Sequence, residues 1–192
     1  MAVRRTILLL ATAATVLTAA GCGRSNVVAA PAATADARIG TAVQIPAAPR
    51  VDGPTVSGEL LDGTPFDLQS WRGQVVVVNF WGSWCAPCRL EAADLQATFE
   101  ATRELGVQFL GVDVRDGRDA AKAFNDSFAI TYPSLFDPAS RTALRFADVP
   151  PSVIPATLVL DRQLRVAAVF RKVVTRGELE TVVRAVAAEA QP

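Results

Sequence analysis

The sequence predicts an α/β fold, a three-layer sandwich with a mixed central sheet, and three observations lead to this class. Extended and helical segments alternate in the order β, α, β, α, short β, α, β, β, α. The continuous apolar run in 75–81 and the largely apolar segment 107–114 are typical of strands that are covered on both faces. A short turn separates the last two strands, so they are expected to form a hairpin that adds antiparallel pairing to the sheet.

The elements before the first helix are predicted from turn residues and β-branched runs. Residues 55–66 contain two short extended segments around Asp62-Gly63, a pair typical of hairpin turns, and predict an N-terminal β-hairpin extension. The run 75–81 is bounded by glycines and predicts the first long strand.

A helix is predicted from Pro87 to Glu104, because Gly106 follows and glycine suits a helix end. Its broad apolar side is expected to consist of Leu90, Ala93, Leu95, Ala97, Phe99 and Leu105. The remaining elements, in chain order, are a strand at 107–114, a helix at 119–128, a short strand at 134–136, a helix at 138–146 that begins with proline, strands at 156–160 and 164–170, and an amphipathic helix at 177–190.

The N-terminal residues are expected to direct export. Residues 1–21 combine a basic start, an apolar stretch and a small-residue exit, which indicates a signal peptide. The residues up to Cys22 resemble the lipobox of bacterial lipoproteins, which implies lipidation of Cys22; the alternative is an ordinary cleaved signal with an incidental cysteine. Residues 22–45 are then a flexible tether, and residues 46–192 form the folded domain.

Composition excludes several classes of function. Acidic and basic residues balance at 19 each, so the chain lacks the excess positive charge that would favour binding to nucleic acid. The chain has no histidine, which removes Ser-His and Cys-His hydrolases and histidine-ligated metal sites. Neither a metal nor a cofactor is expected, and the protein is expected to be a monomer.

Cys85 and Cys88 are expected to carry the chemistry. They lie at the start of the first helix, where unpaired N–H groups and the helix dipole stabilise a thiolate. Cys88 faces the same side three residues on, within disulfide reach, and Pro87 stiffens the turn. Cys85 is expected to be the exposed, attacking sulfur. A structural disulfide would close only a tiny loop, and a zinc site lacks a fourth ligand, so redox exchange is favoured.

The segment 75–161 resembles the thioredoxin-like family of TlpA/ResA type, of the AhpC/TSA–redoxin kind. The resemblance rests on Asn79-Phe80-Trp81-Gly82-Ser83-Trp84-Cys85-Ala86-Pro87-Cys88-Arg89, Tyr132-Pro133 and Val153-Ile154-Pro155-Ala156-Thr157. It implies a thioredoxin-like fold for nearly all of the chain after the tether. It also implies that the Ile154–Pro155 bond is cis, that Pro155 packs against the active-site sulfurs and that the Ile154 backbone binds the substrate chain.

The resemblance also indicates which residues surround the cysteines. Classical thioredoxins have a buried aspartate at the position of Asn79, which cannot titrate, whereas ResA-like members have a glutamate at the position of Glu91. Glu91 lies three residues after Cys88, so partial burial would raise its pKa and let it accept the Cys88 proton. The alternative is a solvated surface glutamate. Trp84 is expected to shield the disulfide, and Trp84 and Pro87 are expected to contact the substrate.

Together these features predict an extracytoplasmic thiol–disulfide oxidoreductase, lipid-anchored to the bacterial cell membrane. The resemblance implies a reductant of protein disulfides, such as apocytochrome c cysteines, that receives electrons from a membrane thiol carrier of CcdA/DsbD type. Two alternatives stay open: a disulfide donor or isomerase for secreted proteins, and a copper-binding thioredoxin-like module that is not an enzyme. The direction of electron flow depends on thiolate stability at Cys85, which the sequence does not determine.

Overall fold

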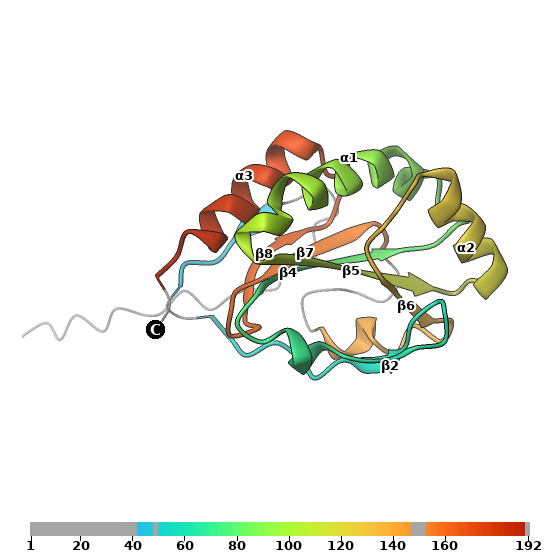
Figure 1. The fold of residues 1–192 in the computed structure, drawn as a ribbon, viewed down its shortest axis with the longest axis horizontal. Helices are drawn as coiled ribbons and strands as arrows, with labels where there is room; N and C mark the ends of the chain where they lie inside the picture. Colours follow the sequence, from blue (N-terminus) through green and yellow to red (C-terminus); the bar gives the residue numbers. More distant parts are fainter. Residues whose placement is uncertain (1–41, 48–49, 147–152, 191–192) are drawn as a thin grey trace, which may run out of the picture. The chain divides into compact units, whose positions relative to one another are not determined.

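A six-stranded mixed sheet forms the centre of the fold, in the order β1-β8-β7-β4-β5-β6 (Figure 1). The structure is a computed structural model and describes residues 42–47, 50–146 and 153–190. The three parallel strands are β4 (Val75–Trp81), β5 (Val107–Val114) and β6 (Ser134–Asp137). The antiparallel strands are β7 (Ala156–Leu160), β8 (Val166–Phe170) and β1 (Ala42–Gln44). The predicted α/β class with a mixed sheet is confirmed.

Helices cover one face of this sheet, and a hairpin with short 3-10 helices covers the other. On the first face, α1 (Ala86–Thr102), which η2 (Arg103–Leu105) extends, lies beside α3 (Arg176–Ala187), and α2 (Arg118–Ser127) adds to this layer (Figure 1). On the second face are β2 (Ser57–Glu59) and β3 (Pro65–Asp67), paired antiparallel as predicted, with η1 (Leu68–Trp71) and η3 (Ala143–Arg145).

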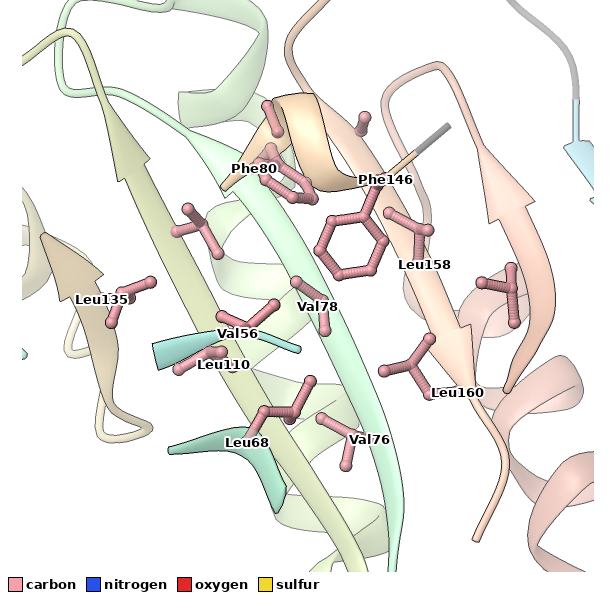
Figure 2. Packing of buried hydrophobic residues seen from close by; sticks show 14 of the residues in the cluster. Val56, Leu68, Val76, Val78, Phe80, Leu110, Leu135, Phe146, Leu158 and Leu160 are labelled. Atoms are coloured by element: carbon pink, nitrogen blue, oxygen red, sulfur yellow. The ribbon is translucent and has the colours of Figure 1, made fainter. Parts of the chain in front are cut away.

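The core is divided between the two faces by the alternation of side chains along β4. Val76, Val78 and Phe80 point toward the hairpin side, where Leu68 and Phe146 pack against them (Figure 2). The intervening valines of β4 pack against the helix side instead. All seven residues of β4 are therefore buried. The strand that leads into the cysteines is fixed from both sides, as the apolar run predicted.

Residues 138–146 do not form the predicted helix. The segment consists of turns and the short η3. Ser140 has a left-handed backbone with a φ of 54°, a conformation that interrupts a helix. The Asp137 carboxylate accepts hydrogen bonds from the backbone N–H groups of Arg141 (2.9 Å) and Thr142 (2.6 Å). These side-chain-to-backbone bonds favour a turn over a helical start.

Two further expectations need correction. Leu90, expected on the apolar side of α1, is 74% exposed, because the buried side of this helix runs through Cys88, Glu91 and Leu95 instead. β1 lies inside the range 22–45 that was assigned to the tether, so the folded part begins before residue 46. All three residues of β1 are exposed, and its place depends on backbone pairing with β8.

Candidate active site

The disulfide between Cys85 and Cys88 lies at the start of α1, directly after the turn that follows β4. Cys85 is the N-cap residue of α1, and its Sγ accepts a hydrogen bond from the Cys88 backbone N–H at 3.2 Å. The two sulfurs are bonded at 2.04 Å. A backbone donor at Cys85 Sγ stabilises negative charge on this atom once the disulfide has opened.

Both cysteines are buried in the oxidised state, with 4% of Cys85 and 2% of Cys88 exposed. The expectation of an exposed Cys85 is therefore wrong for this state. The reason is an apolar cluster in which Trp81 and Phe124 pack around the two sulfur-bearing residues. Ile154 is partly buried and packs against the same cluster. A substrate that reaches the disulfide must therefore contact the apolar side chains of this cluster.

Glu91 lies one helical turn after Cys88, on the buried face of α1, and is fully buried. One carboxylate oxygen accepts a hydrogen bond from Asn79 Nδ2 at 2.8 Å, and the other accepts one from the Val174 backbone N–H at 2.9 Å. Burial raises the pKa of Glu91 to about 7, and these two hydrogen bonds oppose part of that rise. A carboxyl with this pKa exchanges protons near neutral pH, and its burial excludes the alternative of a solvated surface glutamate. The role of Glu91 as acceptor of the Cys88 proton stays a prediction.

Asn79 connects Glu91 to the strand that follows Pro155. Its Nδ2 also donates to Thr157 Oγ1 at 3.0 Å, because Asn79 and Thr157 are paired across β4 and β7. The Ile154–Pro155 peptide bond is cis, as the resemblance implied. The structure thus brings together the α1 face with Glu91 and the start of β7, next to the cis-proline. The sequence had indicated Asn79 only as a residue that cannot titrate.

Trp84, the residue before Cys85, is held by the loop between β5 and α2. Its indole Nε1 donates to the Val114 carbonyl at 3.3 Å, and the Arg115 guanidinium lies 4.8 Å from the ring centroid. Gly82 allows this fold-back, because a Cβ there would lie 2.6 Å from Trp84 Nε1. These contacts fix the ring beside the turn into Cys85. The role of Trp84 as a shield of the disulfide stays a prediction.

Two aspartates next to this turn were not found by sequence reasoning. Asp116 accepts the backbone N–H groups of Ser83 at 2.5 Å and Gly117 at 2.8 Å. Burial acts to raise the pKa of Asp116, but these hydrogen bonds outweigh it and lower the pKa. Asp113 is fully buried, and in the part of the chain that the structure describes neither of its oxygens accepts a hydrogen bond. Burial, and then neighbouring Asp116, raise the pKa of Asp113 to about 8. The available signal was an acidic residue at the end of an apolar strand.

Other predicted residues are placed as follows. Pro87 is exposed in the first turn of α1. Cys22 and the signal segment 1–21 lie outside the described residues. Within the described ranges, no helix is long and apolar enough to cross a membrane. In the same part of the chain, no three His, Cys, Asp or Glu side chains gather as a metal site would require.

The fold and the site define a class of protein. A cysteine pair in a disulfide at the start of a helix, a buried titratable carboxyl one turn further along that helix and a cis-proline bond after Ile154, which packs against the cysteine cluster, are features suited to thiol–disulfide exchange. The protein is a thiol–disulfide oxidoreductase with a thioredoxin-like fold. The chain belongs to the AhpC/TSA family, which it matches over residues 47–169.

Individual relatives agree with this class. The thiol-disulfide oxidoreductase ResA of Bacillus subtilis is 29% identical over 126 residues, which cover 66% of this chain and 69% of that protein. A secreted thiol-disulfide isomerase from Corynebacterium glutamicum has a similar structure, with a TM-score of 0.75 and 39% identity over 80% of this chain and 95% of that one. A DsbF homologue from Corynebacterium diphtheriae gives a TM-score of 0.72 and 38% identity over 76% and 92% of the two chains.

Proposed function

We propose that this oxidoreductase reduces protein disulfides outside the cytoplasm, with the paired cysteines of apocytochrome c as substrate in cytochrome c maturation. The observation that carries the direction of electron flow is the buried carboxyl of Glu91, one helical turn after Cys88. Once ionised, Glu91 disfavours a second negative charge on Cys88. A pair whose thiolate form is less stabilised gives its electrons away more readily, which favours a reductant.

In this proposal the reduced protein donates two electrons. The Cys85 thiolate attacks one sulfur of the substrate disulfide, whose S–S bond breaks and releases a substrate thiolate. Glu91 then takes the Cys88 proton, and the Cys88 sulfur attacks Cys85 and displaces the second substrate thiolate. Cys85 and Cys88 are oxidised to the disulfide, and the substrate is reduced to a dithiol after protonation. A membrane dithiol carrier of CcdA/DsbD type would restore the reduced pair.

The proposed location is the outer face of the bacterial cell membrane, with lipid on Cys22. Support comes from the signal-like residues 1–21, from the lipobox-like residues before Cys22, and from similar solved structures that are named as secreted. In cells that express the full chain, Cys22→Ser should move the protein from the membrane fraction to the soluble extracytoplasmic fraction. Retention in the membrane fraction would contradict the anchor and leave the redox proposal untouched.

The reduction potential of the Cys85–Cys88 pair tests the direction. A potential below about −250 mV supports a reductant, and one near −120 mV supports a disulfide donor. In a second assay, the reduced protein should reduce a disulfide peptide that carries the Cys-x-x-Cys-His haem-attachment sequence. Cys85→Ser should abolish this activity, whereas retained activity would remove the mechanism.

The second candidate is a disulfide donor or isomerase for secreted proteins. It is favoured by the solved structures at 38% and 39% identity, which are named a DsbF homologue and a secreted thiol-disulfide isomerase. The N–H donor at Cys85 Sγ also stabilises the reduced form in this direction. Two results together would support this candidate over the first. The protein should restore activity to a substrate protein with scrambled disulfides, and the Cys85–Cys88 pair should have a potential near −120 mV.

A further inference from the structure

Arg89 presents a positive charge directly after the redox pair. Its Nη1 donates to the Ser83 carbonyl at 3.2 Å, and its guanidinium lies 5.7 Å and 5.4 Å from the ring centroids of Phe124 and Phe128. The carbonyl and the two rings hold the group in place, but none of them carries a negative charge that neutralises it. In the described part of the chain, Arg89 forms no ion pair, and its side chain is exposed.

Arg115 presents a second charge next to Trp84, which lies in the segment directly before the redox pair. Its guanidinium lies 4.8 Å from the centroid of the Trp84 ring. The backbone of Arg115 is left-handed, with a φ of 53°, an uncommon state for a residue with a side chain. Such a conformation persists where the surroundings hold it, and it occurs often at functional sites. Among the described residues, Arg115 has neither an ion pair nor a hydrogen-bonded carboxylate.

The two guanidinium groups have unused capacity for a carboxylate. Each guanidinium has five N–H donors in a planar fork that matches a carboxylate. Arg118 shows the contrast, because its guanidinium also lies over a ring, that of Phe136, but is paired with Glu59 at 3.2 Å and bonded to two carbonyls. Within the described residues the adjacent Asp116 forms no ion pair with Arg115, and its two oxygens accept backbone N–H groups of Ser83 and Gly117.

Apolar side chains are exposed next to these charges. Trp84 is 52% exposed and Leu90 is 74% exposed, and Pro87 also reaches solvent in the first turn of α1. Leu90 lies three residues after Pro87, so the two share one helix face. Large apolar side chains at the edge of a reactive centre are suited to contact a partner chain. The surface around the disulfide therefore combines apolar contact area with two positive charges that have no ion-pair partner among the described residues.

We infer that Arg89 and Arg115 select disulfide substrates that carry acidic side chains within a few residues of the reactive cysteine. The inference rests on the proposed reduction of protein disulfides and adds the chemical class of the substrate. A carboxylate on either side of the substrate cysteine would reach one of the two guanidinium groups while the substrate chain covers Trp84 and Leu90. Charges at the rim of an interface act on the rate of encounter and on choice of partner.

Three peptides with one internal disulfide each test the inference. They are identical except for the residues that flank the cysteines, which are glutamate, glutamine or lysine. The reduced protein should give the highest kcat/KM with the glutamate peptide and the lowest with the lysine peptide. The ratio of glutamate to glutamine rates should fall about two- to fivefold in Arg89→Gln and in Arg115→Gln, and about tenfold in the double variant. High salt should reduce the ratio in the wild type.

The ratio within one variant is the decisive quantity, because a change in folding or redox potential alters both rates together. Arg103→Gln is the matched control, since Arg103 is exposed at the far end of α1 and should keep the wild-type ratio. Equal rates for the three peptides, or an unchanged ratio in the double variant, would overturn the inference while reduction itself stands. If no peptide is reduced, the proposed function fails instead.

Discussion

Among single residues, Glu91 is expected to set the pH dependence of the reaction. With a pKa of about 7, its proton-accepting carboxylate forms as the pH rises through neutrality. Resolution of a mixed disulfide by Cys88 should therefore accelerate over this range. In Glu91→Gln the rise of the resolution rate with pH should be absent. The rate at about pH 7.5 should fall about 100-fold, the lower end of the range for a lost general base. Stopped-flow measurement of thiol release gives this rate as a function of pH.

The control for this prediction is Glu100→Gln on the same helix. Glu100 is exposed and bonds only to Gln96 among the described side chains. This variant should keep both the rise with pH and the rate. A wild-type pH profile in Glu91→Gln would assign the Cys88 proton to another acceptor.

Asp113 is expected to make the protein less stable as the pH rises. Its pKa is raised from 3.8 to about 8, so between these values the folded state keeps a proton that the unfolded state has lost. The stability from this group is complete below the lower value and is lost as the pH rises toward the higher one, by at most about 1.4 kcal/mol per pH unit. Asp113→Asn removes this titration.

Urea denaturation at two pH values measures this effect. Between about pH 5 and pH 7, the free energy of unfolding should fall by about 2 kcal/mol more in the wild type than in Asp113→Asn. Glu91 titrates in both proteins, so the difference isolates Asp113. An identical pH dependence of the two proteins would mean that Asp113 is ionised in the folded state.

The sequence indicated those site residues that lie close together along the chain and share one helix face. Cys85, Cys88 and Glu91 follow each other at intervals of three, which one helix face explains. The hydrogen-bond partners of Glu91 could not be found in this way. Val174 lies 83 residues away from Glu91, and Asn79 donates to Glu91 from β4. Such contacts exist only after the sheet and α3 have packed.

At the scale of elements, the loop between β5 and α2 is expected to hold the turn before Cys85. Asp116→Ala removes the acceptor of the Ser83 N–H. Loss of a hydrogen bond to a charged group costs about 1.5–3 kcal/mol, so exchange of the Ser83 amide should accelerate about tenfold or more. Hydrogen exchange measured by NMR tests this. Asp119→Ala, an exposed change in the first turn of α2, should leave the Ser83 amide unchanged, and equal protection in both variants would contradict the prediction.

The helices and strands differ in how well the hydrophobic pattern of the sequence predicts them. β4 and β5 are buried on both faces, and their largely apolar sequences follow from that burial. β1 is a three-residue edge strand with exposed side chains, and only its backbone bonds to β8 define it. In 138–146, turns replace a helix because the Asp137 side chain accepts backbone N–H groups and Ser140 has a left-handed backbone. Local hydrogen bonds of this kind are not visible in hydrophobic periodicity.

At the scale of the whole described domain, Arg50 joins three distant parts of the chain. Its guanidinium donates to both carboxylate oxygens of Glu189 at 2.6 Å and to Asp161 Oδ2 at 3.2 Å. Arg50 follows β1, Asp161 begins the turn between β7 and β8, and Glu189 follows α3. The Arg50 side chain is only 3% exposed. The segment through which the predicted tether would enter the domain is thus bonded to the residue that follows the C-terminal helix by two positions.

Arg50→Ala is expected to lower the free energy of unfolding by about 2–3 kcal/mol at neutral pH. Removing one partner leaves the buried Asp161 with Arg165 as its remaining cation, and a broken buried pair costs up to about 5 kcal/mol. Arg103→Ala is the control: that side chain is 61% exposed and its ion pair is with the adjacent Glu104, so it should change stability by less than about 0.5 kcal/mol.

The pH dependence separates this ion pair from simple loss of packing. Burial acts to raise the pKa of Asp161, but hydrogen bonds from Arg165 and Arg50 outweigh it and hold the pKa below its ordinary value. Stabilisation from a lowered carboxyl pKa is present above the unfolded pKa and is lost as the pH falls through the folded one. The difference between wild type and Arg50→Ala should therefore be complete near pH 7 and shrink near pH 3 in urea denaturation. A difference that stays constant would attribute the effect to the packing of the arginine stem, because that contribution does not titrate.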